Sequence, residues 1–226
     1  MQDGKKMNKL NILYEDNHII VVVKDANILS QADNTNDLDM LTLIKEYIKK
    51  KSNKPGNVYL GLVHRLDRMV GGVMVFAKTS KAASRLSKQI QNNEFKKSYL
   101  CIVKGILDNK KDTLTNYLVK DEKTRISRVT SKDKGKLAKL EYEVIDENNN
   151  LSLLKINLLT GRHHQIRVQL SNLGHPIYGD NKYDKNPVKT NIRLFAYSLS
   201  FIHPTKNEKL EFTHHPEWME FKMRSN

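Results

Sequence analysis

The amino-acid sequence predicts an α+β protein, a single domain built on a mixed, mainly antiparallel β-sheet flanked by helices and loops. The predicted strands gather in hairpins instead of alternating regularly with helices, which disfavours a doubly wound parallel sheet. The chain has 226 residues, and single cores stop growing only at roughly 250–300 residues. No internal repeat and no linker rich in Pro, Gly or Ser divides it. We therefore expect a polar tail at residues 1–10 and one domain over residues 11–226.

The first predicted elements are two short strands. Ile12–Glu15 and His18–Asp25 are apolar runs separated by Asp16 and Asn17. Such a pattern is typical of strands joined by a tight turn.

A helix is predicted next. Apolar residues recur at helical spacing from Leu41 to Ile48, after the possible N-caps Asp37 and Asp39. We expect this helix to end within Lys49–Pro55.

The middle of the chain predicts strand, helix and strand. Val73–Ala77 is a short apolar run of the kind that forms a buried strand. Thr79 and Ser80 then offer an N-cap for a helix over Lys81–Asn92. Ser98–Lys104 is the next predicted strand.

The remaining elements are mostly strands. The polar and basic segment Asp108–Gly135 is predicted to be a protruding hairpin. Ala138–Ile145 and Leu151–Leu159 are expected to pair as strands. A helix over His164–Leu173 and a late strand over Leu194–Ile202 complete the predicted fold.

Composition limits the class of protein. The formal net charge is +14, which favours a polyanionic partner such as nucleic acid, although a base-composition bias toward lysine codons would also produce it. No run approaches the ~20 apolar residues that a membrane span needs, and the start lacks the apolar region of a signal peptide. The single cysteine, Cys101, cannot form an internal disulfide. We expect a cytoplasmic protein.

The segment His64–Gly72 carries the most pointed chemistry. It places one carboxylate, Asp67, between Arg65 and Arg68. Neighbouring positive charge keeps a carboxylate ionised, as a nucleophile or a base requires. A structural cluster of salt bridges on a turn would give the same pattern.

A second segment combines Gly161 with Arg162, Gln165 and Arg167 at the start of the predicted helix. Helix N-termini bind anions, and these side chains add hydrogen-bond donors. An ordinary capped helix is the alternative. The adjacent histidines at 163 and 164 do not predict a metal site, because adjacent side chains on a helix point about 100° apart.

A third segment is Phe95–Tyr99. Two lysines beside an aromatic residue suit phosphate contact next to base stacking. Core packing of Tyr99 is the alternative.

Taken in order, these segments resemble the RluA-type family of pseudouridine synthases, which isomerise uridine in ribosomal or transfer RNA. The family pattern H-R-L-D-x-x-T-S-G corresponds to His64–Gly72, and K-x-Y corresponds to Lys97–Tyr99. G-R-x-H-Q-I-R corresponds to Gly161–Arg167, and G-x-P-I-x-G-D-x-x-Y to Gly174–Tyr183. The resemblance extends from about Leu13 to Trp218.

The resemblance implies roles for particular residues. Asp67 matches the catalytic aspartate, and Tyr99 matches the aromatic residue that stacks on the target base and can assist proton removal. Arg167 matches the basic residue that pairs with the aspartate. Arg65 matches an arginine that enters the space left by the flipped nucleotide. Leu194 matches the apolar residue beside the base.

Two positions depart from the family pattern. Val70 and Gly71 replace Thr-Ser, and Gln169 replaces a frequent histidine; either change can alter how the loop carrying Asp67 is braced. The family also includes members with an N-terminal RNA-binding domain, which we do not expect here.

The sequence thus predicts an RNA pseudouridine synthase that uses Asp67, Tyr99 and Arg167 for catalysis. Arg65, Arg162, Gln165 and Leu194 are predicted to bind RNA or the target base. We expect no metal, no cofactor and no membrane association, and a monomer. A catalytically silent RNA-binding or ribosome-assembly protein of the same fold is the alternative; a metal-dependent nuclease would need clustered carboxylates that the sequence lacks.

Overall fold

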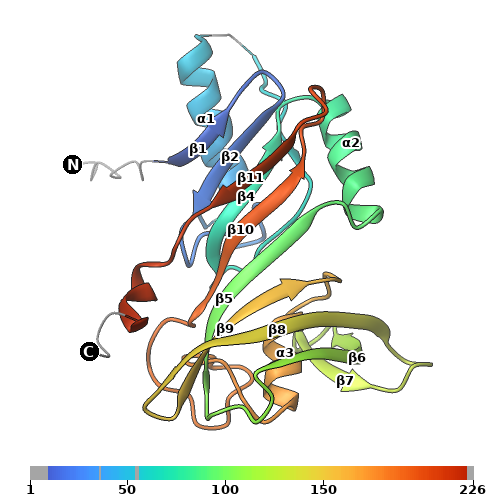
Figure 1. The fold of residues 1–226 in the computed structure, drawn as a ribbon. Helices are drawn as coiled ribbons and strands as arrows, with labels where there is room; N and C mark the ends of the chain where they lie inside the picture. Colours follow the sequence, from blue (N-terminus) through green and yellow to red (C-terminus); the bar gives the residue numbers. More distant parts are fainter. Residues whose placement is uncertain (1–9, 36, 54–55, 223–226) are drawn as a thin grey trace.

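An 11-stranded sheet forms the centre of the computed structural model, which describes residues 10–35, 37–53 and 56–222 (Figure 1). The strands are β1 (Asn11–Glu15), β2 (Ile19–Lys24), β3 (Gly61–Leu62), β4 (Gly71–Ala77), β5 (Lys96–Lys104), β6 (Lys111–Asp121), β7 (Ile126–Thr130), β8 (Lys136–Asn148), β9 (Leu151–Leu158), β10 (Leu194–Ile202) and β11 (Lys209–Thr213). The helices are α1 (Met40–Ser52), α2 (Ser80–Gln91), α3 (Gln165–Asn172) and the 3-10 helix η1 (Glu217–Lys222).

The strand order is β1-β2-β4-β10-β5-β9-β8-β6-β7, with β11 paired to β10 and β3 to β4. Among the named strands of the described chain, β4 and β10 alone pair in parallel. The α+β class and the mainly antiparallel sheet are therefore confirmed. In Figure 1 the long strand β5 passes from the half flanked by α1 and α2 to the half that contains α3.

The sheet separates two hydrophobic clusters. On β2, Ile20 and Val22 face the cluster that includes Ile44 of α1, whereas Ile19 and Val21 face the cluster that includes Leu86 of α2. Side chains alternate between the two faces of a strand. Because both faces are covered, β2 and β4 are buried along their whole length, which explains their continuous apolar runs.

The predicted N-terminal elements are confirmed. β1 and β2 pair antiparallel. Asp39 caps α1 by accepting a hydrogen bond from the Thr42 N–H, and Thr79 caps α2 through the Ala82 N–H in the same way. Residues 1–9 of the predicted tail, and Pro55 at the predicted end of the first helix, lie outside the described residues.

The segment Asp108–Gly135 is a hairpin, as predicted, but it is more than a protrusion. β6 pairs with β7 and also with β8, from Lys111 to Leu118. Leu118 is buried in a small cluster with Val168 of α3. The prediction missed this second pairing because the polar composition hides the few apolar positions that face the sheet. Strands β3 and β11 and helix η1 were not predicted.

Helix α3 begins at Gln165, and not at His164 as expected. His164 has φ 53° and therefore adopts the left-handed conformation, which a helix cannot include. The predicted placement of Arg162 at the N-terminus of a helix is consequently wrong, because two residues lie between it and the start of α3.

The junction of β4 and β10 requires a glycine. Gly72 has φ +139°, and a Cβ there would lie 2.3 Å from the Ala196 carbonyl oxygen. Without a side chain, β4 can approach the first residues of β10 closely. This contact brings the loop that precedes β4, with Asp67, close to Leu194 at the start of β10.

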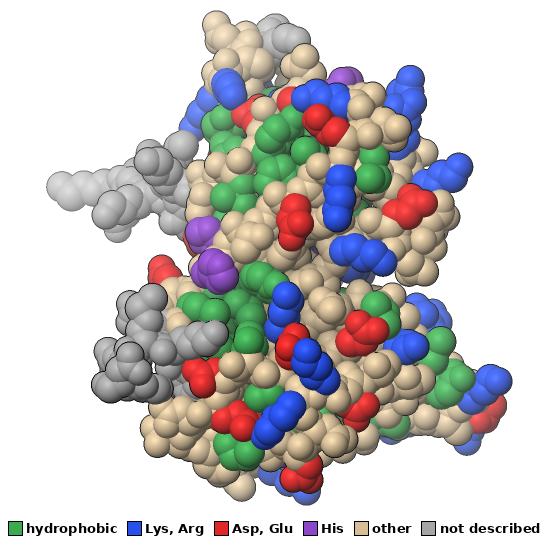
Figure 2. All heavy atoms as spheres, in the orientation of Figure 1, with side chains coloured by type: hydrophobic (Ala, Val, Ile, Leu, Met, Phe, Trp, Pro, Cys, Tyr) green, Lys and Arg blue, Asp and Glu red, His purple; other side chains and the backbone are tan. Residues whose placement is uncertain are grey.

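Charged side chains of both signs lie on the face of the molecule drawn in Figure 2. On the face drawn in Figure 2, basic side chains are scattered and alternate with acidic ones. Within the part of the chain that the structure describes, no helix has the length and apolar character to cross a membrane.

Candidate active site

A large cavity of about 900 Å³ brings the predicted site residues together. Its walls come from the loop after β2, the loop before β4, strand β5, the β6–β7 hairpin and the segment that leads into α3. Every residue predicted for catalysis or RNA binding lines it: Arg65, Asp67, Tyr99, Arg162, Gln165, Arg167 and Leu194. These residues span much of the sequence, so the fold gathers them.

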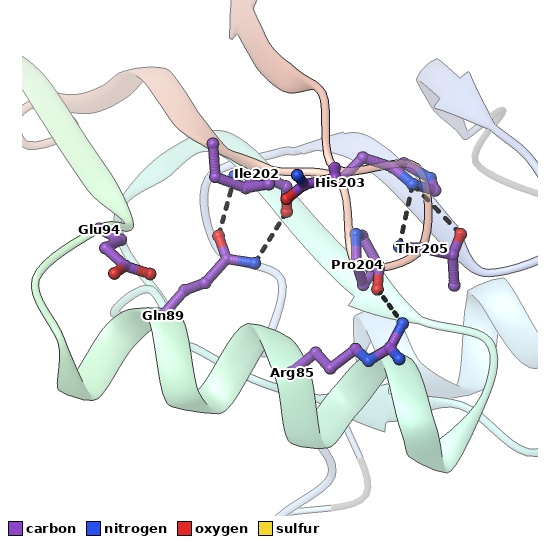
Figure 3. Close-up of a pocket in the computed structure, with 8 residues that line it drawn as sticks. Arg85, Gln89, Glu94, Ile202, His203, Pro204 and Thr205 are labelled. Atoms are coloured by element: carbon purple, nitrogen blue, oxygen red, sulfur yellow. Dashed lines mark hydrogen bonds between the residues drawn. The ribbon is translucent and has the colours of Figure 1, made fainter.

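A second cavity of about 520 Å³ lies between α2 and the end of β10 (Figure 3). Its polar groups bond to one another, because the Gln89 side chain pairs with the Ile202 backbone and Arg85 donates to the Pro204 carbonyl. This cavity contains none of the predicted site residues.

Asp67 lines the large cavity, and its two oxygens have different partners. Oδ2 accepts from Arg167 Nη1 at 2.6 Å and lies 3.1 Å from His164 Nε2. Oδ1 accepts a longer bond, 3.3 Å, from the Met69 N–H. Oδ2 is therefore held by Arg167 and contacted by His164, while Oδ1 is only weakly engaged.

The surroundings of Asp67 keep it ionised. Burial by itself would raise the pKa of this carboxyl group, but the hydrogen bond to His164 and the charge of Arg167 outweigh it. The pKa of Asp67 consequently lies well below its usual range. A carboxylate of this kind is ready to act as a nucleophile or a base at neutral pH.

Arg167 is itself fixed by a second carboxylate. Its Nε and Nη2 donate to Asp180 at 2.7 and 2.6 Å, which leaves Nη1 for Asp67. Arg167 and Asp180 are both almost fully buried. This bidentate pairing fixes the plane of the guanidinium and aims its remaining N–H at Asp67. Asp180 belongs to the last of the four motifs, but its role was not predicted.

His164 is a site residue that sequence reasoning missed. Its ring contacts Asp67 on one side and the Tyr183 hydroxyl, at 2.8 Å, on the other. The expectation that the two histidines point apart is wrong, because both precede the helix and the rings of His163 and His164 stack with centroids 3.7 Å apart. The position of His164 in the G-R-x-H-Q-I-R pattern was the available signal.

The loop that carries Asp67 is held on both sides of that residue. Ser30 Oγ donates to the Leu66 carbonyl and accepts from the Leu66 N–H. Lys24 Nζ donates to the Arg68 carbonyl and also to the carbonyls of Asp25 and Ile28. Burial lowers the pKa of Lys24 to about 8. The sequence did not single out Lys24 or Ser30.

Tyr99 and Leu194 form an apolar wall of the cavity. They lie on the neighbouring strands β5 and β10 and belong to the same hydrophobic cluster. Burial raises the pKa of the Tyr99 phenol well above its usual range, so the phenol is neutral. No other described residue hydrogen-bonds its hydroxyl. A flat apolar ring with a free hydroxyl suits contact with a planar base.

Cationic side chains surround this wall. They are Arg65, Arg68, Lys97, Lys120, Arg125 and Arg162, and the acidic side chains of Asp33 and Glu122 also line the cavity. Arg162 is oriented by a bond from its Nε to the Leu137 carbonyl. Lys97 is half-buried, and within the described ranges its Nζ has no hydrogen-bond partner. Such a rim suits the phosphates of a nucleic acid.

Gln165 is engaged within the protein. Its Oε1 accepts from Thr160 Oγ1 and from the Arg162 N–H, and its Nε2 donates to Lys139 and to Gln169. These bonds use both ends of the Gln165 amide. Its predicted contact with RNA stays a prediction. Gln169 is one of the two departures from the family pattern. Its side-chain oxygen accepts a hydrogen bond from the Gln165 amide.

Among the residues that the structure describes, no three His, Cys, Asp or Glu side chains gather as ligands for a metal ion. The expectation that the protein uses no metal stays a prediction.

Comparison with known proteins shows the family of the chain. Residues 18–172 match the family described as RNA pseudouridylate synthase. An uncharacterized RNA pseudouridine synthase of Mycoplasma pneumoniae is 35% identical over 208 residues, which cover 90% of this chain and 65% of that protein. Ribosomal large subunit pseudouridine synthase C of Buchnera aphidicola is 31% identical over 214 residues, which cover 90% of this chain and 66% of that protein. The chain thus spans about two thirds of the length of these relatives.

The fold is also similar to solved structures. Human RNA pseudouridylate synthase domain containing 1 superposes with a TM-score of 0.77 at 22% identity, over 98% of this chain and 89% of that one. The human domain containing 4 protein gives the same TM-score at 21% identity, over 92% of this chain and 89% of that one.

Proposed function

Because this chain belongs to the RNA pseudouridylate synthase family, we propose that it isomerises specific uridines in RNA to pseudouridine. The observation that carries the proposal is the state of Asp67, an ionised carboxylate with Oδ2 anchored and Oδ1 weakly engaged, in a cavity with an apolar wall and a cationic rim. Ribosomal RNA is the proposed substrate class, since the Buchnera relative is named for the large ribosomal subunit. Transfer RNA is the alternative.

The target uridine must first leave its stack. Extrusion costs a few kcal/mol, least for a nucleotide that is unpaired. Arg65 is exposed at the mouth of the cavity, where it can enter the vacated space. The extruded base would then contact Tyr99 and Leu194, and stacking returns roughly 1–3 kcal/mol. In this proposal Lys97 and Arg162, which line the same cavity, hold the neighbouring phosphates.

Asp67 then acts on the bound nucleotide, covalently or as a base. Its Oδ1 is the proposed reacting atom, because Oδ2 is committed to Arg167 and His164. In the overall reaction the bond between uracil N1 and ribose C1′ breaks and a bond from C5 to C1′ forms. The C5 proton leaves and N1 gains a proton, so atoms and electrons balance without an oxidant, a reductant or a phosphoryl donor.

Replacing Asp67 tests the function. RNA from undermodified cells, labelled with tritium at C5 of uracil, would be incubated with the protein in the presence of a chelator. The wild-type protein should release tritium, and Asp67→Asn should reduce the rate by at least about 10³-fold, because the reacting group is lost. Asp133→Asn, an exposed change outside the cavity, is the matched control and should react at the wild-type rate.

The same assay separates the alternative function. A catalytically silent RNA-binding protein would release no tritium, and Asp67→Asn would leave RNA affinity unchanged. No release by well-folded wild-type protein on undermodified RNA would therefore contradict the proposed reaction. We also propose that the protein acts as a monomer in the cytoplasm.

A further inference from the structure

A chain of two hydrogen bonds and one close ion-pair contact runs from strand β7 to Asp67. The Ser127 N–H donates to the Tyr183 hydroxyl oxygen at 2.9 Å. The Tyr183 hydroxyl lies 2.8 Å from His164 Nδ1, and His164 Nε2 lies 3.1 Å from Asp67 Oδ2. The chain thus links three separate segments to the reacting carboxylate.

The Ser127 N–H at one end of this chain and the Asp67 carboxylate at the other indicate which groups donate the hydrogen bonds. A backbone N–H can only donate, so Ser127 uses a lone pair of the Tyr183 oxygen. The Tyr183 O–H donates to His164 Nδ1, 2.8 Å away, when that nitrogen carries no proton; the Ser127 side chain is a second hydrogen-bond partner near the hydroxyl. A histidine whose Nδ1 accepts carries its proton on Nε2, and Nε2 faces the ionised carboxylate of Asp67. The opposite tautomer would point a lone pair at that negative charge.

Several contacts hold Tyr183 in place for this role. Its ring lies over the Arg167 guanidinium at 5.1 Å and edge-on to the His164 ring, with centroids 5.5 Å apart. Ser171 Oγ in α3 donates to its carbonyl. Burial raises the pKa of the Tyr183 phenol, which keeps the hydroxyl protonated and able to donate.

We propose that Tyr183 is a positioning residue, whose hydroxyl fixes the Nε2–H tautomer of His164 and thereby aims a donor at Asp67 Oδ2. Tyr183 acts through His164 and does not touch the substrate. The effect on catalysis rests on the proposed function, whereas the tautomer of His164 is a property of the free protein. The chain also connects Asp67 to the β6–β7 hairpin, which lines the cationic rim.

The first test measures the tautomer. Imidazole nitrogen chemical shifts would be recorded on ¹⁵N-histidine-labelled protein, with His164 assigned from the spectrum of His164→Gln. Wild-type protein should show Nδ1 unprotonated and Nε2 protonated. Tyr183→Phe keeps the ring over Arg167 but removes the hydroxyl, so His164 should become a mixture of tautomers. An unchanged His164 tautomer in Tyr183→Phe would overturn the proposal, whether or not the protein has the proposed activity.

The second test measures the reaction in a double-mutant cycle. Single-turnover rate constants at saturating RNA would be compared for the wild type, Tyr183→Phe, His164→Gln and the double variant. Tyr183→Phe should be slower by about 3- to 10-fold, the usual effect of one hydrogen bond, with the same RNA affinity. The double variant should be no slower than His164→Gln alone, because Tyr183 acts through His164.

Tyr47→Phe is the matched control. It removes a phenol hydroxyl that bonds Glu15, and neither residue lines the cavity, so it should change stability without changing the rate. If the effects of Tyr183→Phe and His164→Gln add, or if Tyr183→Phe only lowers the melting temperature, the positioning role is wrong. An inactive wild type with the expected tautomer shift would contradict the proposed function alone.

Discussion

Lys24 and Ser30 are residues outside the motifs that bond the loop carrying Asp67. Each contacts a backbone neighbour of Asp67: Ser30 bonds Leu66, and Lys24 bonds the Arg68 carbonyl. Lys24 is completely buried, yet all its hydrogen bonds go to carbonyl oxygens. The buried ammonium group of Lys24 therefore supports the loop that carries Asp67, although Lys24 does not line the cavity.

We expect Lys24→Met to lower the free energy of unfolding by about 1–3 kcal/mol, because three carbonyls, one of them buried, lose their donor. In Lys24→Met the rate constant for tritium release should fall at least about tenfold as the loop loosens. Ser30→Ala should also lower the rate constant, with a smaller loss of stability. Urea unfolding and single-turnover kinetics measure the two effects. Lys78→Met, which loses an ion pair far from the cavity, should reduce stability only. Loss of stability in Lys24→Met with an unchanged rate would contradict this role.

At the residue scale, the family pattern predicted Asp67, Tyr99, Arg167 and Leu194, and the fold places them in one cavity; their roles stay predictions. Lys24 could not be predicted from the residues alone, because a lysine at the end of an apolar strand is usually exposed. Its role depends on the Arg68 carbonyl, 44 positions away in the chain, and only folding brings the two together.

At the scale of elements, Glu15 links strand β1 to helix α1 and to the residue that precedes helix α2. Its carboxylate contacts Lys51 and Tyr47 of α1 and Lys78, which precedes α2. Burial would raise the pKa of Glu15, but these hydrogen bonds and the Lys78 charge lower it from 4.5 to about 2. The folded state therefore binds this proton more weakly than the unfolded state. The stabilisation is complete above pH 4.5 and is lost as the pH falls toward 2.

Glu15→Gln should consequently lower the free energy of unfolding by about 1–2 kcal/mol at pH 7. The difference from wild type should shrink as the pH falls from 4.5 toward 2. Urea unfolding at a series of pH values gives both numbers. Glu143→Gln, in an exposed pair with Lys111, serves as the control and should change stability little. An effect of Glu15→Gln that does not vary with pH would contradict the assignment.

The β6–β7 hairpin is the element that the structure suggests as an RNA contact outside the motifs. Lys120 and Arg125 line the cavity, whereas Lys132 and Lys134 lie beyond it in the β7–β8 turn. We expect Lys120→Gln with Arg125→Gln to weaken RNA binding and to reduce the slope of log affinity against log salt by roughly 1–2, since each phosphate contact to single strands contributes about 0.7.

The matched control is Lys132→Gln with Lys134→Gln, which removes the same net charge. Filter binding over a range of salt concentrations compares the two double variants. If both reduce the slope equally, the hairpin acts through net charge and not through contacts at the cavity.

At the scale of the whole molecule, one copy of the chain supplies the complete candidate site. All predicted site residues line one cavity of a single chain. We therefore expect a monomer in solution, with a mass near 26.2 kDa by light scattering at micromolar concentrations. A stable species of twice this mass would contradict the expectation. Active-site titration with RNA should then give one site per chain.

The sequence alone determined the class of fold, most element positions and the family. Continuous apolar runs mark buried strands such as β2 and β4, and the caps Asp39 and Thr79 mark helix starts, because these properties depend on neighbouring residues. The four motifs and their order along the chain indicated the family.

Only the tertiary structure decided which atoms meet. The pairing of Arg167 with Asp180, the chain through Tyr183 and the support from Lys24 all join residues that lie apart in the sequence. The left-handed backbone of His164 likewise contradicted the helix expected from its neighbours. These features depend on directional hydrogen bonds between buried groups, whose partners are selected by packing, and no local pattern encodes packing.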